Sequence, residues 1–372
     1  MILNKNIRAQ MSGTISTVRS SGAAAATTAI QKALQGMPAH MGNSFAGHQG
    51  MPDFVTTLLA GLGLPSAEGD ENSGGQFLTK SFTNHAGTRN YKVYIPSNYH
   101  GEVVPVIVML HGCTQNPDDF ARGTRMNVVA EEMKCIVVYP AQSQSSNSSK
   151  CWNWFKTLDQ QRDQGEPSII AGITHQVISD YKLDRRRVYV AGLSSGGAMA
   201  IILGTTYPDL YAAVGVHSGL PYGSAQDLTS AFKAMRGANP GVKGKPRTSK
   251  TDFRPRSIPI IVFHGDRDTT VHSSNADRLI KQNVSQGGAC ADRMDPDVIV
   301  QEGKVPHGHA YTRTLYQDKN GRTVAENWMI HGAGHAWAGG SNKGSYTDAK
   351  GPDASEEMMR FFYTQSNTYY DR

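Results

Sequence analysis

Short apolar runs alternate with amphipathic stretches along most of this 372-residue chain. The runs are near-continuous in Val, Ile, Leu, Ala and Phe, which is typical of strands buried on both faces of a parallel sheet. They predict strands at residues 104–110, 135–139, 188–191, 213–216, 258–263 and 325–330. Apolar residues at helical spacing predict helices at residues 119–134, 166–181, 195–206 and 353–363. This alternation favours an α/β protein with a mostly parallel central sheet and helices on both faces.

The first part of the chain has a different texture. Residues 1–75 are rich in Gly, Ala, Ser, Thr and Met and predict a leader and flexible linker with one short helix near 27–34. From residue 76 to 372 the pattern is that of one globular domain. The domain opens with two strand-like runs, 77–82 and 91–95, separated by a turn-like segment, which predicts an antiparallel N-terminal hairpin.

The amino-acid composition favours a globular protein over a membrane-spanning one. An apolar fraction of 38% with 18% charged residues is typical of soluble globular proteins. No apolar run approaches the roughly 20 residues of a membrane span, and no standard secretory signal is present, which predicts a cytoplasmic protein by default and leaves export open. The net charge is +6, and residues 233–256 carry eight basic side chains against Asp252 alone. Without a nucleic-acid motif, this segment predicts solvated surface, or a flap over a site, rather than a nucleic-acid partner.

A nucleophile motif lies between a predicted strand and a predicted helix. Gly192-Leu193-Ser194-Ser195-Gly196 fits the G-x-S-x-G elbow, in which a sharp turn presents the serine hydroxyl at the start of a helix. A Gly-Ser turn that merely links strand to helix is the alternative. The context favours Ser194 as the nucleophile of an α/β-hydrolase fold.

A serine needs a base, and in this fold the acid and then the histidine follow the nucleophile along the chain. The loops after the last two predicted strands offer Asp266 or Asp268, and His331 or His335. We favour His335 because His331 ends its strand, whereas His335 lies in a Gly-containing loop. We favour Asp268 because Asp266 directly follows the strand and its glycine, where capping of the turn would explain it.

Two backbone N–H groups are candidates for the oxyanion hole. One belongs to Ser195, directly after the nucleophile, and the other to Cys113, in the loop that follows the strand 104–110. Cys113 as a nucleophile is the rival interpretation, but it does not lie at a strand-to-helix elbow. The four cysteines match no zinc or redox spacing, so we expect no metal or redox role for them. Catalysis by a serine, a histidine and an aspartate requires no cofactor, and we expect none.

Five motifs in one order resemble the poly(3-hydroxybutyrate) depolymerase-like esterases, whose catalytic domain is shared with feruloyl and acetylxylan esterases. The likeness covers roughly residues 91–362. The motifs are His111-Gly112-Cys113-Thr114-Gln115, Cys151-Trp152-Asn153-Trp154, the elbow at Ser194, the run from His264-Gly265 to Asp268, and Gly334-His335-Ala336-Trp337.

The resemblance implies roles for individual residues. It implies a triad of Ser194, Asp268 and His335, supports the oxyanion donors at Cys113 and Ser195, and suggests a Cys113–Cys151 disulfide. It also makes His111, Trp152 and Trp337 candidates for the substrate pocket, with simple core packing as the alternative for each tryptophan.

The resemblance further implies hydrolysis of carboxylic esters through an acyl-enzyme. The substrates would be short-chain, 3-hydroxyalkanoate-oligomer or hydroxycinnamoyl esters, and no nucleic-acid partner is expected. Secreted polymer depolymerases typically carry a signal peptide, a Thr-rich or fibronectin-like linker and a substrate-binding domain, none of which is visible, so we expect soluble oligomers or small esters rather than crystalline polymer. The alternatives are a serine peptidase of the same fold and a non-catalytic binding protein.

Overall fold

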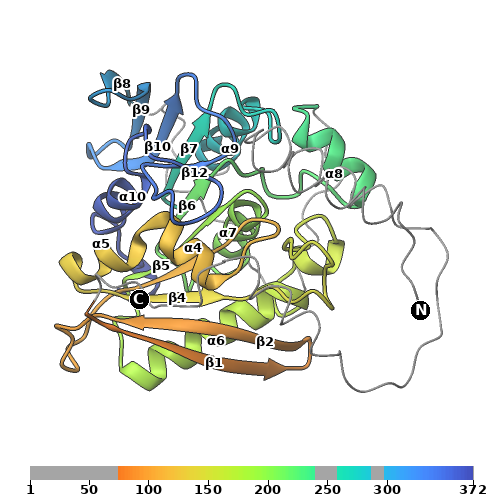
Figure 1. Ribbon diagram of the computed structural model, residues 1–372, viewed down its shortest axis with the longest axis vertical. Helices are drawn as coiled ribbons and strands as arrows, with labels where there is room; N and C mark the ends of the chain where they lie inside the picture. Colours follow the sequence, from red (N-terminus) through yellow and green to blue (C-terminus); the bar gives the residue numbers. More distant parts are fainter. Residues whose placement is uncertain (1–73, 239–257, 286–296, 372) are drawn as a thin grey trace, which may run out of the picture. The chain divides into compact units, whose positions relative to one another are not determined.

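The computed structural model describes residues 74–238, 258–285 and 297–371 (Figure 1), and the fold lies in the unit Gly75–Arg372. The predicted leader helix at 27–34, most of the basic segment 233–256 and Cys290 lie outside the described residues.

A ten-stranded sheet forms the centre of the fold, in the order β1-β2-β4-β3-β5-β6-β7-β10-β9-β8. Within this order the neighbouring strands β4, β3, β5, β6, β7 and β10 pair in parallel. The β1–β2 hairpin is antiparallel, and these pairings confirm the predicted architecture. Every residue of the five strands from β3 to β7 is buried, as their near-continuous apolar sequences require. The eight strands from the hairpin to β10 are β1 Gln76–Asn84, β2 Gly87–Ile95, β3 Val106–Leu110, β4 Ile136–Pro140, β5 Val188–Leu193, β6 Ala213–His217, β7 Ile260–Gly265 and β10 Thr323–Ile330.

Helices cover both faces of the sheet (Figure 1). Alternate residues of each central strand point to opposite faces, so that Val106 and Val108 contribute to one core and Ile107 and Met109 to the other. The first core is closed by α6 Gly165–Tyr181, α7 Ser195–Thr206 and α9 Ser274–Ser285. The second core is closed by α4 Pro117–Thr124, α5 Met126–Met133 and α10 Ala354–Phe362.

The single helix predicted at 119–134 is wrong in one respect, because the structure divides it into α4 and α5. Arg125 lies between them with φ 57°, and its N–H caps the Ala121 carbonyl. The helix begins two residues earlier than predicted, because the Asn116 side chain accepts from the Asp119 N–H and Pro117 occupies the first turn.

Two antiparallel strands extend the sheet beyond β10 and were not predicted. They are β8 Asp297–Lys304 and β9 Ala310–Gln317. The side chains of β8 are almost all exposed, so this edge strand has no buried face to produce an apolar pattern in the sequence. The structure also adds a helix, α8 Leu228–Met235, and a short pair of strands, β11 Trp337–Ala338 and β12 Thr347–Asp348. No helix in the described ranges is both long and apolar enough to cross a membrane.

Candidate active site

Ser194 occupies the turn between β5 and α7 with φ 58° and ψ −118°, a left-handed conformation that non-glycine residues rarely adopt. The turn is held on both sides by close backbone contacts. A Cβ on Gly196 would lie 2.0 Å from the Leu110 carbonyl oxygen, and one on Gly192 would lie 2.4 Å from the Gly196 carbonyl carbon. The Ser194 N–H donates to the His217 carbonyl at 2.9 Å. The two glycines are therefore required for the elbow itself, as the motif predicts.

The strand order brings the remaining catalytic candidates to the same edge of the sheet. β5, β6, β7 and β10 are parallel neighbours, and Gly265 at the end of β7 pairs with Ile330 at the end of β10. The loops that follow these strands leave from the carboxyl edge, where α/β proteins build their sites. Ser194, Asp268 and His335 all lie on loops of this edge.

Asp268 and His335 form a buried pair. Asp268 Oδ2 lies 2.7 Å from His335 Nδ1, and the Asp268 and His335 residues are 5% and 6% exposed. Asp268 Oδ1 accepts from the backbone N–H groups of Thr270 and Val271 at 2.9 and 2.8 Å. Burial raises the pKa of the Asp268 carboxyl, but His335 and His264 outweigh it and hold that pKa well below its usual range. Asp268 is therefore ionised, and His335 carries its proton on Nδ1, which leaves Nε2 to act as a base.

The rival residues form a second, exposed pair. Asp266 Oδ2 lies 3.1 Å from His331 Nδ1, and Asp266 Oδ1 accepts from the Gly332 N–H at 2.7 Å. His331 Nε2 is already engaged with Thr312 Oγ1 at 2.9 Å. The geometry therefore favours Asp268 and His335 as the catalytic pair. Of the two pairs, only this one is buried, and its histidine Nε2 has no hydrogen-bond partner among the described residues.

The oxyanion candidates lie just after two adjacent strands, β3 and β5. β3 pairs with β5, so that Leu110 faces Gly192 and the loop after β3 runs beside the elbow. In that loop the Gly112 N–H donates to Gln115 Oε1 at 2.9 Å and the Thr114 N–H donates to the Ser149 carbonyl at 2.7 Å. Within the described chain, no hydrogen bond uses the N–H of Cys113 or that of Ser195, so both are free to receive an oxyanion.

A disulfide joins Cys113 to Cys151 and ties the oxyanion loop to the segment 141–153. Ser195 Oγ lies 3.5 Å from Cys113 Sγ. Cys135 is a free thiol, and burial raises its pKa to about 12, so it has no nucleophilic character at neutral pH.

The three residues predicted to line the substrate pocket are buried in the protein interior. His111 and Trp337 are each 1% exposed and Trp152 is fully buried. The Trp152 indole donates to the His111 carbonyl at 3.1 Å, and the Trp337 indole donates to Ser355 Oγ at 3.1 Å. Rings without exposed surface cannot contact a substrate that enters from solvent, so core packing describes both tryptophans better.

Two buried histidines behind the site escaped the sequence analysis as functional candidates. His264 Nε2 lies 3.4 Å from Asp268 Oδ2 and 2.7 Å from the Val271 carbonyl. His217 Nε2 accepts from the Ala338 N–H at 3.0 Å, and its ring stacks on Phe263. His217 directly follows the predicted strand 213–216 and ends the observed β6, so only its closeness to an apolar run hinted at burial.

His217 gives a pH prediction. Burial, with smaller contributions from His264 and His335, lowers the pKa of His217 to about 3 from an ordinary 6.5. The unfolded chain therefore binds a proton that the folded chain excludes, so stability is complete above pH 6.5 and is lost as pH falls towards 3. Between pH 7.5 and pH 5 we expect His217 to lower the free energy of unfolding by about 2 kcal/mol.

The measurement is urea unfolding of wild type and His217→Gln at both pH values. The variant is expected to be less stable at pH 7.5, yet to lose about 2 kcal/mol less than wild type on acidification, because glutamine does not titrate. Equal losses in the two proteins would contradict the assignment.

The sequence of this chain is similar to those of known esterases and depolymerases. The family described as "Esterase PHB depolymerase" matches residues 89–294. Poly(3-hydroxyalkanoate) depolymerase C of Paucimonas lemoignei is 32% identical over 68% of this chain and 59% of its own length. Feruloyl esterase B of Neurospora crassa is 28% identical over 82% of this chain and 97% of its own. Acetylxylan esterase A of Talaromyces purpureogenus is 28% identical over 56% of each chain. The chain thus spans little more than half the length of two of these three relatives.

A solved structure supports the fold. The acetyl xylan esterase from Aspergillus awamori superposes with a TM-score of 0.59 at 21% identity, covering 78% of this chain and 99% of that one. This likeness, together with the observed strand order, confirms the predicted α/β-hydrolase fold.

Proposed function

Because the chain belongs to the esterase PHB depolymerase family, we propose that it is a serine carboxylic-ester hydrolase that works through an acyl-enzyme. The observation that carries the proposal is the buried Asp268–His335 pair on the same sheet edge as the strained elbow at Ser194. A strained nucleophile turn and a buried, hydrogen-bonded imidazole are both costly to maintain, and a binding scaffold needs neither.

The proposed reaction has two halves. Ser194 Oγ attacks the ester carbonyl while His335 Nε2 takes its proton, and the Cys113 and Ser195 N–H groups stabilise the oxyanion. His335 then protonates the leaving alkoxide as the carbon–oxygen bond breaks. Water, deprotonated by the same His335, attacks the acyl-enzyme, and the acid leaves as Ser194 recovers its proton. Asp268 keeps the imidazole in the required tautomer and stabilises its cation.

The names of the relatives support a substrate class. Their names describe depolymerisation of poly(3-hydroxyalkanoate) and cleavage of feruloyl and acetylxylan esters. We propose that this chain hydrolyses short-chain esters, 3-hydroxyalkanoate oligomers or hydroxycinnamoyl esters. The ester substrate is the one partner that the proposal requires.

The test combines covalent labelling with a substrate panel. A fluorophosphonate is expected to label wild type in a one-to-one ratio, with the added mass on the peptide that contains Ser194. The panel comprises p-nitrophenyl butyrate, methyl ferulate, acetylated xylan and a 3-hydroxybutyrate trimer, with a p-nitroanilide as the amide control. Turnover of at least one ester faster than the anilide supports the proposal and names the substrate class. Absence of both labelling and turnover would sink it in favour of a binding protein, and faster amide cleavage would favour a peptidase.

A further inference from the structure

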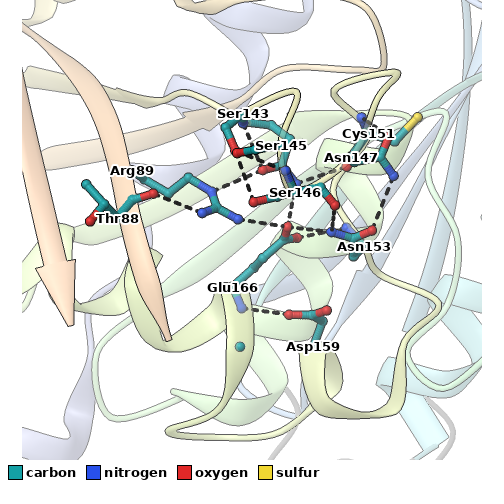
Figure 2. Close-up of polar contacts among 12 residues, drawn as sticks. Thr88, Arg89, Ser143, Ser145, Ser146, Asn147, Cys151, Asn153, Asp159 and Glu166 are labelled. Atoms are coloured by element: carbon teal, nitrogen blue, oxygen red, sulfur yellow. Dashed lines mark hydrogen bonds and ion pairs between the residues drawn. The ribbon is translucent and has the colours of Figure 1, made fainter. Parts of the chain in front are cut away.

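A buried carboxylate lies behind the oxyanion loop. Glu166, in the first turn of α6, is 4% exposed and accepts hydrogen bonds from three side chains and one backbone group. Glu166 Oε1 accepts from Asn153 Nδ2 at 2.7 Å and from Arg89 Nη2 at 3.3 Å, and Oε2 accepts from the Asn153 N–H at 2.8 Å (Figure 2). Oε1 also accepts from Gln142 Nε2. The Glu166 N–H in turn donates to Asp159 Oδ1 at 2.7 Å. Because both carboxylate oxygens of Glu166 accept hydrogen bonds, the network holds Arg89, Gln142 and Asn153 in one arrangement.

Gln142 connects this carboxylate to the catalytic edge. Its side-chain amide is held at both ends, because Oε1 accepts from Arg89 Nε at 3.0 Å and Nε2 donates to Glu166 and to the Cys151 carbonyl at 3.0 Å. Its backbone N–H donates to His111 Nε2 at 3.1 Å. The Arg89–Glu166 ion pair thus anchors the side chain of the residue whose backbone N–H contacts His111.

The partners of His111 determine its tautomer. Nδ1 lies 2.7 Å from the Gly112 carbonyl oxygen, which can only accept, and Nε2 faces the Gln142 N–H, which can only donate. The imidazole is therefore neutral with its proton on Nδ1. Burial lowers the pKa of His111 to about 4, which keeps the ring neutral throughout the working range of an esterase.

The Gly112 carbonyl belongs to the same peptide as the Cys113 N–H. A peptide is planar and trans, so the two groups point in opposite directions, and a bond that holds the carbonyl also aims the N–H. We propose that His111 is a positioning residue of the oxyanion hole: its Nδ1–H holds the Gly112 carbonyl so that the Cys113 N–H faces the substrate, and the Arg89–Glu166 pair holds His111 in that tautomer through Gln142. The inference rests on the proposed function, because it takes the Cys113 N–H as an oxyanion donor.

The first test removes or retains the Nδ1 donor. His111→Leu is expected to lower kcat for p-nitrophenyl butyrate by about 10- to 100-fold with KM within about 3-fold, because the oxyanion forms only in the transition state. His111→Asn keeps an N–H near Nδ1 and is expected to recover at least about 5-fold in kcat over His111→Leu. Equal losses in the two folded variants, or a loss confined to KM, would overturn the proposal.

The second test addresses the carboxylate. Glu166→Gln is expected to lower kcat by about 3- to 10-fold, since Gln142 loses its charged acceptor. Glu326→Gln is the matched control: Glu326 is also buried, at 1% exposure, and is paired with Arg313 and Arg360, but it has no contact with the oxyanion loop. We expect the control to lose stability while its kcat stays within about 2-fold of wild type. A kcat loss that is the same in both variants would indicate a general structural effect and would count against the proposal.

A measurement on the unmodified protein decides the question if the variants fail to fold. Long-range ¹H–¹⁵N spectra of histidine-labelled wild type are expected to show His111 neutral with the proton on Nδ1 from pH 5.5 to pH 8. An Nε2–H tautomer, or titration within that range, would overturn the proposal. Failure of the proposed function would appear separately, as a wild type that cleaves no ester whatever the tautomer of His111.

Discussion

Replacing Ser194 with Ala is expected to lower kcat/KM for p-nitrophenyl butyrate by at least about 10³-fold. In the proposed mechanism the variant loses the hydroxyl that forms the acyl-enzyme, while the Cys113 and Ser195 N–H groups would still bind the substrate carbonyl. The fold should survive, because the strain at φ 58° belongs to the backbone of residue 194 and is the same for serine and alanine.

Steady-state kinetics and thermal unfolding of Ser194→Ala measure both expectations. Ser168→Ala is a suitable control, because Ser168 is a mostly buried serine of α6 whose hydroxyl contacts Asn84 and the Gly165 carbonyl rather than the elbow. The control should retain activity within about 2-fold, as expected for a residue outside the site. A Ser194→Ala protein that is folded and retains more than a tenth of wild-type activity would remove Ser194 from the mechanism.

Asp268→Asn is expected to lower kcat by about 10³- to 10⁴-fold with little change in fold. The reason lies in the two oxygens of the carboxylate. The Thr270 and Val271 N–H groups bind one of them, so an asparagine would place its carbonyl oxygen there and turn its NH₂ towards His335. His335 Nδ1 would then accept, its proton would move to Nε2, and the ring could no longer take the proton of Ser194.

The chain supplies its own matched control for this variant. Asp266 is paired with His331 through the same atoms, Oδ2 and Nδ1, and its other oxygen also accepts a backbone N–H. Asp266→Asn changes the same chemistry at an exposed position and should leave kcat within about 3-fold of wild type. Equal losses in the two variants would make Asp266 part of the catalytic machinery, and a loss confined to Asp266→Asn would reverse our assignment.

Periodicity and local motifs predicted much of the fold. The five fully buried strands, β3 to β7, were recognisable because a strand covered on both faces must be apolar at nearly every position. The elbow was recognisable because two close backbone approaches demand glycine on either side of Ser194. The edge strand β8 lacked such a signal, because its side chains are almost all exposed. The break at Arg125 was missed because the amphipathic pattern continues across it.

The sequence by itself determined the class of fold, the elbow that makes Ser194 the proposed nucleophile, and a choice of two acids and two bases on successive loops. Only the tertiary structure decided which aspartate pairs with which histidine, because partners 65 to 67 residues apart meet through the register of β7 against β10 and differ in burial, not in local sequence. It also moved Trp152 and Trp337 from a pocket wall to the interior, since the side on which an aromatic ring packs depends on the helices that cover it. The connection from Glu166 to the Gly112 carbonyl has no signature in the sequence for the same reason. Its members come from four separate segments, and only folding brings Arg89 and Gln142 to the Glu166 carboxylate and the Gln142 N–H to His111.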